Sequence, residues 1–137
     1  MDKTLIIIIV VVILAAGGFW AWQSGVFNKT SVPPTPLPQG IVLFYSPDCP
    51  HCQDVEAFIL ANNIDQKVKY TKLEVPFNGK TNPQLEANAG LLIKTAQGCK
   101  IDTSSGVGIP FLYDGNGKCY SGEVDIPNFL KAQAGIK

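Results

Sequence analysis

The feature that most constrains this chain is an uncharged stretch at positions 4–28, and Leu5 to Ala16 within it is entirely aliphatic. As a helix, Leu5 to Trp22 would be about 27 Å long, close to the hydrocarbon thickness of a bilayer. We therefore expect residues 1–27 to form a transmembrane anchor. The rest of the 137-residue chain has room for one domain, expected at residues 40–137.

Two other interpretations of the apolar stretch are a cleaved signal peptide and a buried helix. Small residues at positions 15–17 resemble a cleavage site, but they lie inside the apolar run and are followed by bulky aromatic residues at positions 19–22. Aromatic rings at that end favour the headgroup region of a membrane. A buried helix is disfavoured because Leu5 to Ala16 has no polar face. A retained anchor is the favoured interpretation.

Few charges flank the anchor, with Lys3 before it and Lys29 after it. A short positive N-terminus ahead of the first apolar segment favours a cytoplasmic N-terminus, which places the domain outside the cytoplasm. The four cysteines of the chain fit that placement. Positions 28–39 hold four prolines among Ser and Thr, a composition typical of an extended spacer between anchor and domain.

The charge balance argues against a nucleic-acid binder. Eleven Lys and Arg residues cancel eleven Asp and Glu residues, and every basic residue is Lys. The chain therefore has neither a basic excess nor an Arg side chain for bidentate contacts with phosphate or guanine.

The apolar patterning of the domain alternates between strand and helix periods. It predicts a strand at Ile41–Ser46, a helix starting at Pro50 and a second strand at Gln66–Val75. A second helix is expected from Asn82-Pro83 to Gly98, followed by a hairpin of Phe111–Tyr113 and Lys118–Ser121. The last helix is expected to be capped by Asp125, with Pro127 in its first turn. This β-α-β-α-β-β-α order predicts a compact α/β domain in which helices flank a small mixed sheet.

Two thiols separated by Pro50 and His51 lie at the first strand-to-helix junction. Cys49 would occupy the helix N-terminus, where free N–H groups and the helix dipole favour a thiolate, so it is the candidate nucleophile. Cys52, one turn into the helix, is the candidate resolving thiol. His51 is expected to add a hydrogen bond or a positive charge near Cys49. A stabilised thiolate makes the disulfide more oxidising.

Other uses of this cysteine pair fit the sequence less well. A zinc site is disfavoured because Cys99 and Cys119 do not form a second closely spaced pair, and we expect no metal. Haem attachment requires His where this chain has Gln53. A purely structural disulfide is also disfavoured. Cys99 and Cys119 can either pair as a structural disulfide or stay as free thiols, and the disulfide is slightly favoured.

The segment from Phe44 to Cys52 and the later Gly108-Ile109-Pro110-Phe111 motif resemble the thioredoxin superfamily over Ile41 to Lys137. The resemblance implies a thioredoxin-like fold in which Pro110 is cis and packs beside the dithiol. It also implies that the backbone of Ile109 hydrogen-bonds an incoming peptide. An ordinary turn with a trans proline is the alternative.

Two details refine the resemblance. The Pro50-His51 pair is similar to that of DsbA-like periplasmic oxidants, and Gly117–Gly122 resembles the thioredoxin-like domains that accompany vitamin K epoxide reductase homologues. The latter resemblance implies a quinone-linked membrane oxidase as electron acceptor. Thioredoxins carry a buried Asp where this chain has Leu43. Glu56 is a poor substitute and is expected to be a solvated surface carboxylate.

Together these features predict a monomeric, membrane-tethered thiol-disulfide oxidoreductase that acts on protein thiols outside the cytoplasm. We expect oxidation or isomerisation through the Cys49–Cys52 disulfide with no other cofactor. One alternative is an extracytoplasmic disulfide reductase of the cytochrome-maturation type. Another is a non-catalytic binding module with the same fold.

Overall fold

The computed structural model of the chain describes residues 36–136. The expected anchor at residues 1–27 and the linker up to residue 35 lie outside the described residues. Within the described part, no helix is both long and apolar enough to cross a membrane.

The described residues form an α/β domain, as the patterning predicted. Its elements are β1 (Ile41–Tyr45), α2 (Pro50–Ala61), α3 (Ile64–Lys67), β2 (Tyr70–Glu74), α4 (Pro83–Gly98), β3 (Phe111–Tyr113), β4 (Cys119–Ser121) and α5 (Gly122–Gln133). Apart from the short helix α3, this is the predicted order.

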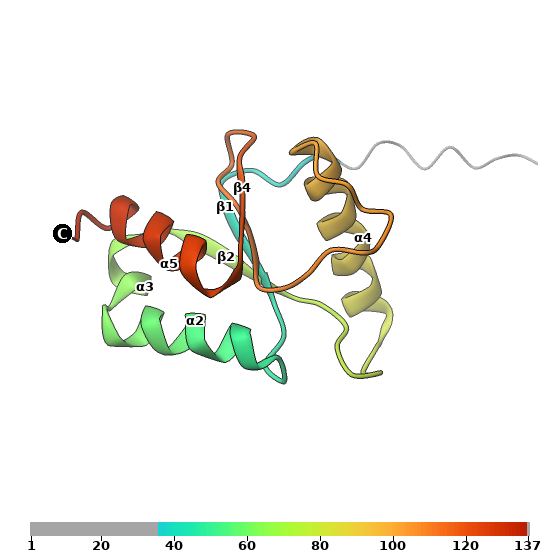
Figure 1. Cartoon of the computed structure of the whole chain (residues 1–137), viewed down its shortest axis with the longest axis horizontal. Helices are drawn as coiled ribbons and strands as arrows, with labels where there is room; N and C mark the ends of the chain where they lie inside the picture. Colours follow the sequence, from blue (N-terminus) through green and yellow to red (C-terminus); the bar gives the residue numbers. More distant parts are fainter. Residues whose placement is uncertain (1–35, 137) are drawn as a thin grey trace, which may run out of the picture. The chain divides into compact units, whose positions relative to one another are not determined.

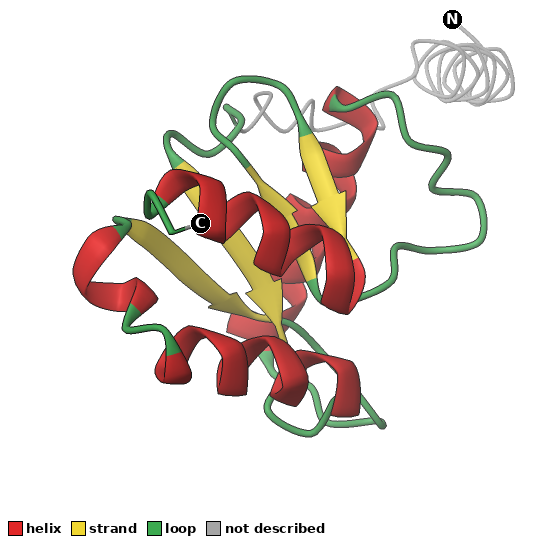
Figure 2. Cartoon of the chain, turned by 60° about the vertical axis from the view of Figure 1, so that its left-hand side comes forward, coloured by secondary structure: helices red, strands yellow, loops and turns green. Residues whose placement is uncertain are grey.

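The four strands form one mixed sheet in the order β2-β1-β3-β4. Strand β1 runs parallel to β2 and antiparallel to β3, and β3 pairs antiparallel with β4. Helices α2 and α5 lie on one side of this sheet and α4 lies on the other (Figure 1). The second view shows the same layers with the sheet between the helices (Figure 2). The predicted mixed sheet flanked by helices is therefore confirmed.

Strand β1 is buried on both faces because it lies inside the sheet and helices cover each side. Leu43 belongs to one apolar cluster with α2, α5 and Leu112, and Val42 and Phe44 belong to a second cluster with α4 and Phe111. Successive side chains of a strand point to opposite faces, which explains the alternation. A continuous apolar run therefore suits this position.

Two element boundaries differ from the sequence prediction by more than one residue. The chain makes a helical turn at Ile64–Lys67, after Asn63 adopts a φ of 51°, so the second strand begins later than expected. The last helix begins at Gly122, which places Asp125 inside the first turn and Pro127 inside the helix. Gly122 adopts a φ of 81° and donates its N–H to the Pro110 carbonyl at 3.0 Å, which lets α5 follow β4 directly.

Candidate active site

The dithiol lies where β1 gives way to α2. The Cys49 N–H donates to the Ser46 carbonyl at 3.2 Å, which closes the turn after the strand. Cys49 is the N-cap residue, Pro50 occupies the first turn, and the Cys49 carbonyl accepts the helix bond from Gln53 N–H at 3.1 Å. A proline suits this position because the first N–H groups of a helix have no intrahelical partner. Cys49 therefore lies at the N-terminus of α2, as the sequence predicted.

Both thiols are free and buried, with exposed fractions of 3% for Cys49 and 1% for Cys52. They are three residues apart, so they lie on the same side of the first helical turn. Burial is the main cause that raises the pKa of Cys52 to about 12; interactions with Cys49 and Glu56 contribute to the increase, and a Ser46 backbone hydrogen bond opposes it. Cys52 is therefore a protonated thiol at neutral pH.

The segment before β3 reaches the dithiol from the other side. The Cys49 Sγ donates to the Ile109 carbonyl at a distance of 3.8 Å. The Ile109–Pro110 peptide bond is cis, and Pro110 is fully buried. The structure thus brings the two motifs that are about sixty positions apart in the sequence into contact through Cys49 and Ile109.

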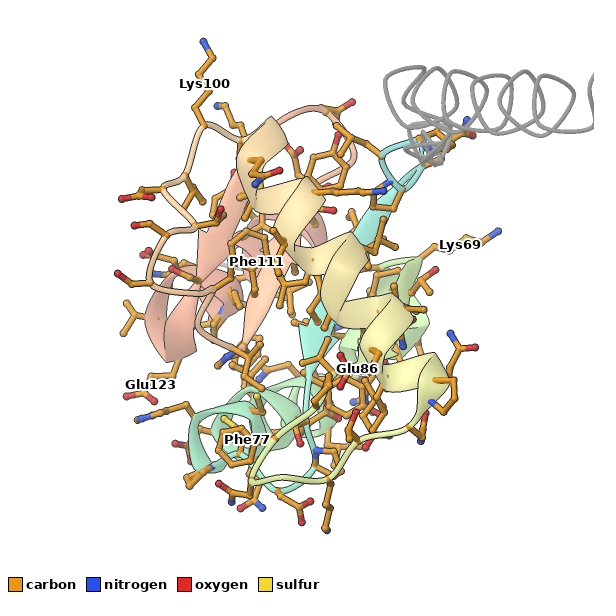
Figure 3. The ribbon with its side chains drawn as sticks, turned by 90° about the vertical axis from the view of Figure 1, so that its right-hand side faces the viewer. Lys69, Phe77, Glu86, Lys100, Phe111 and Glu123 are labelled. Carbon is orange, nitrogen blue, oxygen red and sulfur yellow. A yellow bond between two sulfur atoms is a disulfide. The ribbon has the colours of Figure 1, made fainter. Side chains whose placement is uncertain are left out.

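A groove of about 730 Å³ opens beside Cys49. Its walls are the start of α2, the segment after β2, one side of α4 and the loop before Pro110, and its lining includes Phe77, Leu92, Ile93, Val107 and Ile109. Figure 3 shows Phe77 in the segment between β2 and α4, and Glu86 on α4. The groove is largely apolar, with Glu86 as its carboxylate. It can accept an extended apolar segment next to the buried thiol.

The segment from β2 to α4 is fixed to the start of α2 by an ion pair. Lys80 Nζ donates to Asp48 Oδ2 at 2.6 Å, and Asp48 immediately precedes Cys49. Phe77 and Lys80 also form a short antiparallel bridge, which shapes the turn between them. These contacts hold the Phe77 wall of the groove near the dithiol.

His51 has a different partner from the expected one. Its Nδ1 pairs with the Glu123 carboxylate in the first turn of α5, and both side chains are well exposed, at 67% and 45%. In the part of the chain that the structure describes, the His51 side chain makes no hydrogen bond or ion pair with Cys49.

Glu56 is not the solvated surface carboxylate that we expected. Its side chain is 27% exposed, and Oε2 accepts a 2.6 Å bond from Lys72 Nζ on β2. Its Oε1 is buried and has no hydrogen-bond partner among residues 36–136. The expectation was wrong because Glu56 lies one turn after Cys52, on the part of α2 that faces β2.

Cys99 and Cys119 form a disulfide with a Cα–Cα distance of 6.0 Å. The bridge joins the residue after α4 to the start of β4. In the sheet, Cys119 lies opposite Tyr113 of β3, and Tyr113 lies opposite Val42 near the start of β1. The dithiol follows the end of β1. The two cysteine pairs therefore lie at opposite ends of the sheet.

Three exposed side chains near the dithiol come closest to a metal-ligand set among the described residues. His51, Asp54 and Glu123 each offer a ligand atom within 4.8 Å of the others. His51 and Asp54 are three positions apart on α2, and Glu123 comes from α5. No similar group includes Cys49 or Cys52 in the described range.

Comparisons with protein-family models, with curated proteins and with solved structures found no match. The interpretation of the site therefore depends on its residues and geometry.

Sequence reasoning missed several residues that shape the site. Glu123 is 72 positions from His51, and no local pattern links the two. Phe77 and Lys80 lie in a segment without helix or strand periodicity. Their roles depend on how β2 and α4 are placed around the dithiol, which the chain order alone does not specify.

Proposed function

We propose that this chain is a thioredoxin-like thiol-disulfide oxidoreductase. The observation that carries the proposal is the contact between the N-cap thiol of Cys49 and the carbonyl of Ile109, at the end of an apolar groove. A structural cysteine pair has no need of a groove beside it. A dithiol that exchanges disulfides with other proteins needs one sulfur that a substrate can reach from such a groove.

In the oxidising direction, a substrate thiolate attacks Cys49 Sγ of the Cys49–Cys52 disulfide. The intramolecular S–S bond breaks, Cys52 leaves and takes up a proton, and a mixed disulfide forms between Cys49 and the substrate. A second substrate thiolate then attacks the substrate sulfur and releases Cys49. The substrate gains one disulfide and the protein gains two electrons and two protons.

Burial of Cys52 supports the assignment of Cys49 as the exchanging sulfur. Cys49 borders the groove, whereas Cys52 does not. At neutral pH the raised pKa of Cys52 also keeps it protonated, so it does not compete as an attacking thiolate. In the reducing direction Cys49 attacks the substrate disulfide, and the Cys52 thiol then attacks Cys49 Sγ of the mixed disulfide. The bond between Cys49 and the substrate breaks, and the leaving substrate sulfur takes up the proton from Cys52.

The proposed substrates are extended protein segments that carry a cysteine next to an apolar residue. The groove supplies apolar contacts from Phe77, Leu92 and Val107. The Ile109 backbone offers hydrogen bonds to an extended chain, as in strand addition to a sheet edge.

The proposed location is the outer face of a membrane, with residues 1–27 as anchor and the cytoplasm on the N-terminal side. The Cys99–Cys119 disulfide supports an oxidising compartment. The resemblance to DsbA-like oxidants and to domains that accompany vitamin K epoxide reductase homologues suggests a quinone-linked membrane oxidase as the partner that reoxidises the dithiol.

The test is to trap substrates on Cys49 in native membranes. In the full-length Cys52→Ala variant, Cys49 should exchange with substrate disulfides, and the mixed disulfides should accumulate because no Cys52 thiol is present to release the substrate. Nonreducing gels followed by mass spectrometry would detect them. The matched control is Cys49→Ala/Cys52→Ala, in which Cys99 and Cys119 stay intact and the adducts should disappear.

Absence of adducts in the folded Cys52→Ala protein would overturn the proposal. Stoichiometric zinc on the purified protein would instead favour the non-catalytic binding module. A measured potential near that of cytosolic glutathione would favour the reductase alternative.

A further inference from the structure

The imidazole of His51 is held by a residue from the other end of the domain sequence. Its Nδ1 pairs with Glu123 in the first turn of α5, and Glu123 lies at the end of that helix nearest α2 (Figure 3). The pair joins two helices that pack on the same side of the sheet. Asp54 lies nearby on α2, but among the described residues it forms no ion pair with His51. The Glu123 contact therefore orients the His51 ring, which stays largely exposed to solvent.

The other carboxylates near Cys49 are those of Asp48, which immediately precedes it, and of Glu86 in the lining of the groove. The carboxylate of Asp48 is neutralised by Lys80. The first turn of α2 contains no acidic residue of its own. Glu123 therefore adds a carboxylate from α5 near the N-terminus of α2, and this carboxylate pairs directly with His51.

We propose that Glu123 is a positioning residue that holds the His51 side chain away from Cys49 and so makes the Cys49–Cys52 disulfide less oxidising than the Cys-Pro-His-Cys sequence alone would make it. This inference concerns the regulation of the same site and rests on the proposed function. It assigns to α5 a role in redox tuning, in addition to packing against α2.

The direction of the effect follows from the charges. A thiolate at Cys49 is stabilised by a nearby positive charge or hydrogen-bond donor and destabilised by a carboxylate. Replacing Glu123 by Gln frees the imidazole to turn toward Cys49 and removes one negative charge. Whether His51 is neutral or protonated, the net charge near Cys49 in Glu123→Gln is at least as positive as in the wild type. The dithiol should therefore gain stability relative to the disulfide.

The experiment is a redox equilibration of the full-length protein in detergent with glutathione. The oxidised protein and two glutathione molecules give the dithiol and glutathione disulfide, so one S–S bond breaks and one forms. In Glu123→Gln the equilibrium constant for this reaction should rise about fivefold, an effect of the size expected for an exposed charge near a thiolate. The increase should shrink at high salt.

Asp125→Asn is the matched control. Asp125 lies in the same first turn of α5 and is exposed, and the structure gives it no contact with His51. It should leave the equilibrium constant within a factor of two. In a His51→Ala background, Glu123→Gln should have no more effect than Asp125→Asn, because only the removal of one carboxylate charge from the first turn of α5 then remains. Glu123→Asp should restore most of the wild-type value.

Equal constants for Glu123→Gln and Asp125→Asn would overturn the inference and leave the proposed function standing. The same holds if the effect of Glu123→Gln persists without His51. Failure of the folded wild-type protein to equilibrate with glutathione would overturn both. Thermal unfolding of each variant checks that the exposed substitutions leave the fold intact.

Discussion

Burial has a larger effect on the pKa of Cys52 than any neighbouring charge has. The side chain is 1% exposed, and loss of hydration is the largest cause of its raised pKa. Three residues earlier, Cys49 has nearly the same burial but borders the groove and the Ile109 carbonyl. The spacing of the two thiols along one helical turn thus separates an exchanging sulfur from a protected one.

The raised pKa of Cys52 predicts a pH dependence of stability. The thiol ionises near pH 9 in the unfolded chain and only near pH 12 when folded. Above pH 9 the unfolded state releases a proton that the folded state retains, so stability falls as pH rises, by at most about 1.4 kcal/mol per pH unit. Below pH 9 both states keep the proton and this contribution is constant.

The measurement compares Cys49→Ser with Cys49→Ser/Cys52→Ala by urea unfolding between pH 7 and pH 10. Removing Cys49 from both variants isolates the titration of Cys52, and burial, the main cause of the shift, is retained. The single variant should lose roughly 1 kcal/mol relative to the double variant by pH 10. Parallel pH profiles would contradict the prediction.

Helix α4 forms a wall of the groove, and its start depends on one side chain. The Asn82 Oδ1 accepts hydrogen bonds from the N–H groups of Gln84 and Leu85, each at 2.9 Å. Further along, the buried Asn88 side chain donates to the Glu74 carbonyl at 2.8 Å and ties the helix to the end of β2. Capping and this tether together place the helix next to the dithiol.

Replacing Asn82 by Ala should destabilise the domain by about 1 kcal/mol, because two N–H groups lose their acceptor. Asn82→Asp is the matched control and should retain the wild-type stability, since its carboxylate accepts the same bonds and suits a helix N-terminus. Urea unfolding at neutral pH measures both. An Asn82→Ala protein as stable as Asn82→Asp would show that the cap contributes nothing.

The elements that the sequence predicted well have local causes. Pro50 and Asn82-Pro83 mark helix starts through their own chemistry, and the apolar run of β1 suits a strand buried on both faces. The start of α5 was missed because it depends on a bond from Gly122 to the Pro110 carbonyl, which exists only after the strands pair. Likewise, Cys49 and Cys52 follow from spacing, whereas the Glu123 contact and the groove follow from tertiary packing.

At the scale of the whole domain, the two cysteine pairs have separate structural settings. The dithiol follows the end of β1, and the Cys99–Cys119 disulfide lies beside the start of the same strand. The loop that begins at Cys99 ends at Ile109, which contacts Cys49. Its far end is held independently, because Pro110 is buried and its carbonyl accepts from Gly122 N–H. Global stability and the chemistry of the dithiol should therefore respond differently to loss of the disulfide.

The Cys99→Ala/Cys119→Ala variant should lose about 3 kcal/mol of unfolding free energy, the amount expected for a crosslink that closes a loop of this length. The disulfide spans 20 positions of the chain, so the unfolded variant regains the freedom of that loop. Well below its unfolding midpoint, the variant should equilibrate its Cys49–Cys52 pair with glutathione within about twofold of the wild-type constant. Urea unfolding and the glutathione equilibrium measure the two quantities on the same preparation.

A large change in the equilibrium constant of the folded variant would mean that the loop transmits the state of one cysteine pair to the other. The single variant Cys99→Ala provides the matched control, because it removes the crosslink and keeps Cys119, and it should reproduce the loss of stability.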